Sequence, residues 1–228
     1  TSKTRREVEP IRNAIGTDDP FIVENGGGVF FPAGYRGFNI KNSQTIYGYS
    51  LLQLGLPYGQ IRQFFVKVRF AFEAKGFGDM TASEIASLTG FSEDQAIVAK
   101  DREFTEPFIL GAAQDLVALS ELAAKEGMTI TTGGRFFHLM GKDQDKGRAV
   151  VMVRDIFQQH HEEKILTVGL GDSENDRVFL EKVDIPVLIP HPERGYLDMD
   201  RPGLVRAAAP GSRGWNGVME AVLDAYAI

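Results

Sequence analysis

The chain has 228 residues, of which 43% are hydrophobic and 25% charged, and its formal net charge is -6 at pH 7. It is longer than the roughly 100–150 residues of a common single domain, so one large or two modest domains are possible. The acidic balance argues against nucleic-acid binding, and no apolar run approaches the ~20 residues of a membrane span, so we expect neither partner. Cysteine is absent, which excludes disulfides and thiolate metal sites and fits a cytoplasmic location.

The first third of the chain predicts helices on either side of short strands. Residues 1–16 (TSKTRREVEPIRNAIG) have helical spacing, with an expected start at Thr1 or Ser2 and a glycine stop. Residues 20–32 (PFIVENGGGVFFP) predict a strand, a glycine turn and a second strand. Residues 45–55 predict another strand, and residues 58–76 predict a helix with an aromatic apolar face.

The middle of the chain predicts a mixed α/β region. Two capping-box patterns open helices at 81–90 and 92–102, where a hydroxyl residue is followed three places later by an acidic or amide residue. A strand over 106–111, a helix over 113–127 and a strand pair over 128–141 follow. We expect these elements to form a module of their own.

The last third of the chain alternates helices with apolar strands. A helix over 145–160 precedes a strand ending at Gly171, a helix, a strand over 185–190, a short strand over 204–209 and a closing helix over 214–227. Such alternation predicts a parallel sheet covered on both faces. The expected organisation is a discontinuous α/β core of residues 1–40 and 142–228 with residues 41–141 inserted as a second domain.

The motif GDSEND directly follows an apolar strand and contains Asp172, Asn175 and Asp176. In open parallel sheets ligands bind beyond the carboxyl ends of the strands, where these side chains would lie. Clustered carboxylate and amide oxygens suit Mg²⁺, which takes one or two carboxylates together with waters and phosphate. A plain helix cap would explain one aspartate, but not two glycines, two aspartates and an asparagine together.

Two further segments contain groups that suit an anion. Lys146 stands at a helix start, where a bound phosphate would make a lysine favourable, although a solvated lysine is the simpler interpretation of this residue alone. The hydroxyls of Thr1 and Ser2, next to Lys3, could donate to a phosphate or simply cap the first helix. Taken alone, the cap is the better interpretation.

Two glycine turns present polar side chains. Glu24 and Asn25 stand in VENGGG, which is also typical of a hairpin turn. Arg135 and His138 stand in TTGGRFFHL, where the histidine could equally be a half-buried residue of a strand.

Taken in order, these motifs resemble a known family. TSK, ENGG, the Lys146–Gly147 pair and GDSEND together resemble the haloacid dehalogenase (HAD) superfamily of phosphatases, with a large α/β cap of the C2 type. GGRFFHL, DKGRAV and APGSRGW narrow the resemblance to the mannosyl-3-phosphoglycerate phosphatase group. The resemblance spans nearly the whole chain and implies a HAD-like Rossmannoid parallel sheet with an inserted α/β cap.

The resemblance also implies a chemistry. It implies a hydrolase that uses Mg²⁺ to cleave a phosphorylated small molecule through an aspartyl-phosphate intermediate. Thr1, Lys146 and Asp172 would be catalytic, and Asp172, Asp176 and Asn175 would hold the metal. Substrate binding would fall to Ser2, Lys3, Glu24, Asn25, Arg135 and His138, with Arg135 gripping the glycerate carboxylate.

The family's first motif, Asp-x-Asp-x-Thr on an apolar strand, does not occur in these residues. The acid pairs at 143–145 and 198–200 have the spacing but neither the strand nor the threonine. We expect the nucleophile and its central strand before Thr1, and therefore expect that this chain is a fragment. A sugar phosphatase or phosphohexomutase of other specificity, or a non-catalytic binding protein of the same fold, stays open as an alternative.

Overall fold

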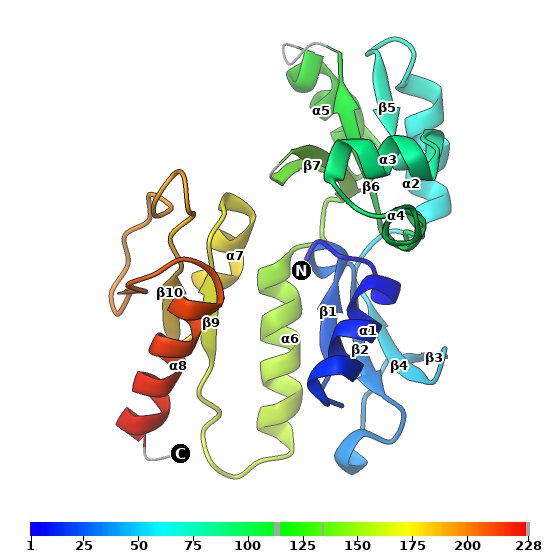
Figure 1. Cartoon of the computed structure of the whole chain (residues 1–228). Helices are drawn as coiled ribbons and strands as arrows, with labels where there is room; N and C mark the ends of the chain where they lie inside the picture. Colours follow the sequence, from blue (N-terminus) through cyan, green and yellow to red (C-terminus); the bar gives the residue numbers. More distant parts are fainter. Residues whose placement is uncertain (112–114, 134, 227–228) are drawn as a thin grey trace. The chain divides into compact units, whose positions relative to one another are not determined.

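The structure is a computed structural model that describes residues 1–111, 115–133 and 135–226. It forms two compact units, Thr1–Asp145 and Lys146–Ile228. Figure 1 follows the chain from blue at the N-terminus to red at the C-terminus. The expected insertion of residues 41–141 as a separate domain stays a prediction.

The first sheet of unit 1 is antiparallel, with strand order β1-β2-β4-β3. Its strands are β1 (Phe21–Val23), β2 (Gly28–Pro32), β3 (Gln44–Ile46) and β4 (Tyr49–Gln53), with the short 3₁₀ turns η1 (Glu24–Gly26) and η2 (Tyr35–Gly37) beside β2. Helix α1 (Arg5–Ile15) packs Val8 against a cluster of buried side chains of this sheet: Phe21, Val23, Phe30 and Leu51. The strand–turn–strand expected over 20–32 is therefore confirmed.

Helix α1 begins later than the sequence pattern predicted. Its N-cap is Thr4, whose hydroxyl accepts a hydrogen bond from the Glu7 N–H, and the Glu7 carboxylate accepts one from the Thr4 N–H at 2.8 Å. This reciprocal capping box fixes the first turn at Arg5. The expected start at Thr1 or Ser2 was wrong, because residues 1–3 lie outside the helix and bind other parts of unit 1.

The second sheet of unit 1 has helices on both faces. Its strands β5 (Ala74–Gly76), β6 (Thr105–Leu110), β8 (Phe136–Gly141) and β7 (Met128–Gly133) pair in that order, all antiparallel. Its helices are α2 (Tyr58–Val68), α3 (Ala82–Thr89), α4 (Glu93–Lys100) and α5 (Leu116–Lys125), with the turn η3 (Phe77–Asp79). Phe108 packs with α2 and α5, whereas its neighbour Ile109 packs with α3 and α4, as alternation along a strand requires.

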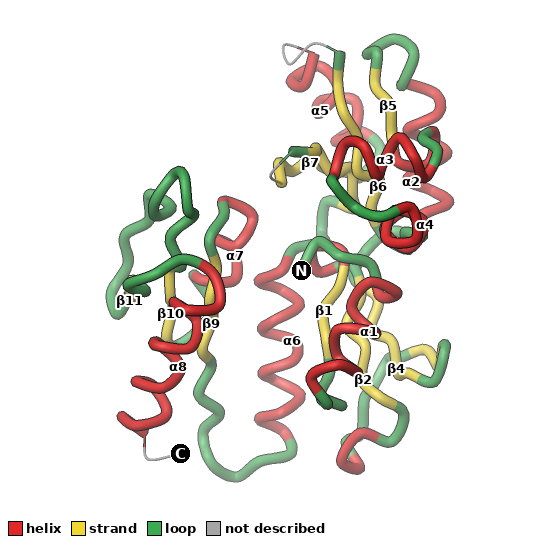
Figure 2. The backbone as a smooth tube through the Cα atoms, in the orientation of Figure 1, coloured by secondary structure: helices red, strands yellow, loops and turns green. Residues whose placement is uncertain are grey.

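Unit 2 contains a parallel sheet of order β11-β10-β9. Its elements are α6 (Lys146–Gln159), β9 (Val168–Gly171), η5 (Glu174–Asp176), α7 (Arg177–Leu180), β10 (Ile185–Leu188), β11 (Val205–Arg206) and α8 (Gly211–Tyr226). Val187 of β10 packs against α8 through Val218, and the adjacent Leu188 packs against α7 through Leu180. The expected parallel sheet with helices on both faces is confirmed in this unit (Figure 2).

Two predicted elements differ from the structure. The single strand expected over 45–55 is a hairpin, because Tyr47 and Gly48 take positive φ (52° and 80°) and turn β3 into β4. The helix expected over 58–76 ends at Val68, and residues 74–76 form β5. Residues 113–114, 134 and 227 of other predicted elements lie outside the described part of the chain. None of the described helices is long and apolar enough to cross a membrane.

Candidate active site

The centre of the candidate site in unit 2 is a buried ion pair between Lys146 and Asp176. The Lys146 Nζ lies 2.7 Å from the Asp176 Oδ1, and the two side chains are 10% and 12% exposed. Lys146 is the first residue of α6, and Asp176 ends η5, which follows β9. The two residues lie 30 positions apart in the sequence, and the structure brings their side chains into direct contact.

The second carboxylate oxygen of Asp176 is held by the loop after β9. The Asp176 Oδ2 accepts hydrogen bonds from the Ser173 hydroxyl at 2.8 Å and from the N–H groups of Asp172 and Ser173 at 3.2 and 3.3 Å. Gly171 permits this approach, since a Cβ at that position would lie 2.6 Å from the Asp176 Cβ. The first glycine of the GDSEND motif is therefore required by close packing of the aspartate.

These contacts set the ionisation of Asp176. Burial alone would raise the pKa of this carboxyl group. The Lys146 charge and the hydrogen bonds from Lys146, Ser173 and the Asp172 N–H outweigh the burial and hold the pKa of Asp176 below its usual value. The site therefore combines a fixed ammonium group with a carboxylate that stays charged.

Asp172 differs from Asp176 in its exposure. Asp172 is the first residue after β9, and its side chain is exposed. Asn175 is half-buried, and its Oδ1 accepts a hydrogen bond from the Ser173 hydroxyl at 2.6 Å. Within the described residues, no group of three or more His, Cys, Asp or Glu side chains is arranged to hold a metal ion. The predicted metal site stays a prediction.

In unit 1, the predicted residues Thr1, Ser2 and Lys3 form an irregular segment held by main-chain hydrogen bonds. The Thr1 and Lys3 carbonyls accept from the N–H groups of Asn25 (2.8 Å) and Glu24 (3.0 Å). The Thr1 Oγ1 accepts from the Lys3 N–H at 3.2 Å, and the Lys3 Nζ lies 3.5 Å from a Glu7 carboxylate oxygen. This segment therefore meets the ENG turn, two of whose residues were also predicted to belong to the site.

Glu24 and Asn25 are buried residues with a strained backbone. Their exposed fractions are 0% and 2%, and their φ angles are 46° and 57°. A non-glycine residue with such a left-handed backbone costs roughly 1 kcal/mol. The Glu24 carboxylate accepts from the N–H groups of Glu103 (2.7 Å) and Phe104 (3.1 Å) and from the Thr105 hydroxyl (2.7 Å). The substrate contact predicted for both residues stays untested.

The two remaining predicted residues lie in or beside β8. Arg135 is exposed in the turn that precedes this strand. His138 is buried, with 7% exposed, and pairs across the sheet with Pro107 and Thr131. Their predicted roles in substrate binding are likewise untested.

Two buried side chains around the ENG turn were not predicted from the sequence. Arg102 is 7% exposed, and its Nε lies 3.4 Å from the Glu24 Oε2. Gln144 is 1% exposed, and its Nε2 donates to the Glu24 carbonyl at 2.6 Å. Both lie far from Glu24 in the sequence, so no local pattern could reveal these contacts.

Comparisons with known proteins relate the chain to phosphatases, although no protein-family model matches it. The glucosyl-3-phosphoglycerate/mannosyl-3-phosphoglycerate phosphatase of Persephonella marina is 52% identical over 224 residues, which cover 98% of this chain and 83% of that protein. The chain belongs to the mannosyl-3-phosphoglycerate phosphatase family. A protein of the same name from Methanococcoides burtonii is 36% identical over 96% of this chain and 81% of its own. The mannosyl-3-phosphoglycerate phosphatase of Pyrococcus furiosus is 31% identical over 83% of this chain and 75% of its own.

Solved structures confirm the fold expected for a member of this family. The protein 0175 of Thermoplasma acidophilum matches with a TM-score of 0.65 at 15% identity, over 96% of this chain and 79% of its own. The sucrose-phosphatase of Synechocystis matches with a TM-score of 0.59 at 15% identity, over 97% and 82%. At such low identity the likeness concerns the fold alone. The solved structures thus confirm the predicted HAD-like α/β fold of the chain. Its membership of the mannosyl-3-phosphoglycerate phosphatase family confirms the predicted phosphatase class.

Proposed function

We propose that the protein is a Mg²⁺-dependent phosphomonoester hydrolase that acts on a glycosyl-3-phosphoglycerate, with mannose or glucose as the sugar. The observation that carries this proposal is the buried Lys146–Asp176 pair beside the exposed Asp172 at the carboxyl end of β9. The names of the relatives support the substrate class, since they are phosphatases of glucosyl- or mannosyl-3-phosphoglycerate.

Lys146 would stabilise charge during phosphoryl transfer. Such reactions depend mainly on positioning and on positive charge near the phosphoryl oxygens. The Asp176 contact at 2.7 Å fixes the ammonium group, so no reorganisation is needed when the substrate arrives. A fixed charge of this kind suits a transition state better than a mobile surface lysine would.

The residues after β9 fit a Mg²⁺ ion. Mg²⁺ needs only one or two carboxylates, because waters and substrate phosphate complete its shell. Asp172 offers an exposed carboxylate, whereas both oxygens of Asp176 already accept hydrogen bonds or ion pairs. Asp172 would therefore be the direct ligand, with Asp176 and Asn175 supporting the loop. When bound, the ion would supply positive charge to the phosphoryl oxygens.

The proposed reaction has two displacement steps. A carboxylate nucleophile attacks phosphorus; the bond from phosphorus to the glycerate oxygen breaks, and that oxygen takes a proton from a general acid. Water then attacks the aspartyl-phosphate and releases inorganic phosphate. The Thr1 hydroxyl would donate a hydrogen bond to the transferring phosphoryl group. Ser2 and Lys3 would assist in binding it.

Substrate choice would depend on Arg135 and His138. The exposed guanidinium of Arg135 can bind a carboxylate with two parallel hydrogen bonds, which suits the glycerate group. His138 and Asn25 would contact sugar or glycerate hydroxyls. A phosphate ester without a carboxylate would therefore be a poorer substrate.

The test is an assay of the full-length protein with and without Mg²⁺ on a panel of glycosyl-phosphoglycerates, sugar phosphates and an aryl phosphate. Asp172→Asn should lower Mg²⁺-dependent hydrolysis at least about 100-fold, because the remaining amide is a weaker metal ligand. Asp155→Asn is the matched control, since this aspartate of α6 is exposed and pairs only with Arg154 among the contacts of the described residues. Equal activity of the Asp172 variant and the control would refute the metal role. A higher kcat/KM for sugar phosphates than for glycosyl-phosphoglycerates would refute the proposed substrate class.

A further inference from the structure

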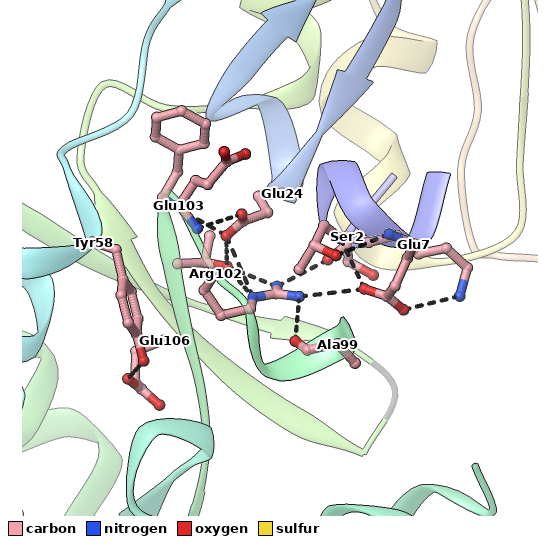
Figure 3. Close-up of polar contacts among 12 residues, drawn as sticks. Ser2, Glu7, Glu24, Tyr58, Ala99, Arg102, Glu103 and Glu106 are labelled. Atoms are coloured by element: carbon pink, nitrogen blue, oxygen red, sulfur yellow. Dashed lines mark hydrogen bonds and ion pairs between the residues drawn. The ribbon is translucent and has the colours of Figure 1, made fainter. Parts of the chain in front are cut away.

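A second buried ion pair lies in unit 1, between Arg102 and Glu24. Their side chains are 3% and 0% exposed, and the Arg102 Nε lies 3.4 Å from the Glu24 Oε2 (Figure 3). The Thr105 hydroxyl bridges the pair, because it donates to the same Glu24 oxygen at 2.7 Å and accepts from the Arg102 Nη2 at 2.7 Å. A buried charge pair needs such complete hydrogen bonding to offset its loss of hydration.

The guanidinium of Arg102 also holds the segment that contains Thr1. Its Nη2 donates to the Ser2 carbonyl at 2.9 Å, and its Nη1 lies 3.8 Å from a carboxylate oxygen of Glu7, which caps α1. Its Nη1 donates to the Ala99 carbonyl at the end of α4 at 3.4 Å. Figure 3 shows Arg102 between Glu24 on one side and Ser2 with Glu7 on the other. A single cation therefore joins three separate segments of unit 1.

The main chain of the ENG turn also holds this segment. The positive φ angles of Glu24 and Asn25 accompany hydrogen bonds from their N–H groups to the carbonyls of Lys3 and Thr1. Arg102 donates to the Ser2 carbonyl, so the carbonyls of all three residues 1–3 accept a hydrogen bond. Residues 1–3 have no helical or strand hydrogen bonding of their own to fix them.

From this geometry we propose that Arg102 and Glu24 are positioning residues for phosphoryl transfer, and that they act through the placement of Thr1. The proposal rests on the proposed function, in which the Thr1 hydroxyl donates to the phosphoryl group. In this proposal Glu24 does not contact the substrate, since both of its carboxylate oxygens accept hydrogen bonds from groups of the protein. The strained turn fits this task, because strain is retained where the surrounding contacts determine the backbone.

The test compares Arg102→Lys with wild type in the full-length protein. Lysine keeps the charge but cannot reach Glu24, Thr105 and the Ser2 carbonyl together with one ammonium group. A displacement of about 1 Å in a group that contacts the reacting phosphoryl lowers rate by up to about 100-fold. We therefore expect kcat to fall about 10- to 100-fold for the glycosyl-phosphoglycerate and for an aryl phosphate alike, with KM changed less than about threefold. Glu24→Gln should behave in the same way.

Arg62→Lys is the matched control. Arg62 is also an ion-paired arginine of unit 1, half-buried with 19% of its side chain exposed, and it pairs with Asp79 at 2.7 Å and with the fully buried Glu106 at 3.2 Å. Within the described residues it pairs with carboxylates distant from residues 1–3, so its replacement should lower the unfolding midpoint by several degrees without a change in kcat. A purely structural Arg102 would give this same pattern, and that result would overturn the proposal.

Thr105→Val provides a milder test if the charged variants do not fold. It removes only the hydroxyl between Arg102 and Glu24, and a fewfold loss of kcat at unchanged KM would support the proposal. Suppose that wild type hydrolyses the substrate, and that kcat is unchanged in Thr105→Val and in every folded variant of the ion pair. That result would refute the positioning role alone. Absence of hydrolysis by wild type on the whole panel would instead refute the proposed function, and the positioning role with it.

Discussion

The Lys146–Asp176 pair allows a prediction that does not depend on the substrate. At 2.7 Å and an effective dielectric constant of about 20, two unit charges attract with about 6 kcal/mol before the cost of desolvation. Removal of one partner from a buried pair typically costs about 3–5 kcal/mol, because the other charge is left without compensation. We therefore expect Lys146→Met to lower the free energy of unfolding by about 3 kcal/mol or more at pH 7.

The pH dependence follows from the lowered pKa of Asp176. Burial works against ionisation, but Lys146 and the surrounding donors keep the pKa below the unfolded value of about 3.9. A group with a lowered folded-state pKa stabilises the protein above its unfolded pKa and loses that contribution as the pH falls through the folded one. In Lys146→Met the isolated Asp176 would protonate more readily, so the difference from wild type should shrink between pH 7 and pH 3.

Urea unfolding followed by circular dichroism, at several pH values, measures both effects. A double-mutant cycle with Asp176→Asn isolates the pair, and we expect a coupling energy of at least about 1.5 kcal/mol. The reasoning fails if Lys146→Met costs less than about 1 kcal/mol, or if its cost is the same at pH 3 and pH 7.

Three other substitutions test separate parts of the molecule. Arg135→Ala should lower kcat/KM for a glycerate-bearing substrate at least about tenfold more than for an aryl phosphate, because only the former offers a carboxylate; equal losses in steady-state assays would contradict this. Gly27→Ala should destabilise by about 1–3 kcal/mol in urea, since its Cβ would lie 2.4 Å from the Phe104 Cβ. Gly59→Ala, with nothing within 4 Å of its Cβ, should lose no stability.

The strongest local patterns in the sequence predicted the structure well. The parallel sheet of unit 2 followed from apolar strands that alternate with helices, and GDSEND located the acidic residues at the end of β9. The capping boxes at Thr81 and Ser92 also form as expected. In each case the determining interactions are local, so a short stretch of sequence contains them.

Other features depended on partners distant in the chain. The sequence could not show that Arg102 lies beside Glu24, because 77 intervening residues must fold before the two meet. Nor could it show that Lys146 is buried rather than solvated, since Asp176 supplies the charge that makes burial tolerable. The hairpin at 44–53 was missed because Tyr47 is an unusual residue for a positive φ.

The single tryptophan of the chain, Trp215, lies in α8 of unit 2, and its side chain is about half exposed. Indole fluorescence therefore reports on the surroundings of this one helix, whereas four of the six tyrosines belong to residues 1–145. Tryptophan emission, excited at a wavelength too long for tyrosine, would report on the unit that contains Lys146 and Asp176. Tyrosine emission would report mostly on the unit that contains Glu24 and Arg102. The two groups of variants proposed above can thus be distinguished optically without added labels.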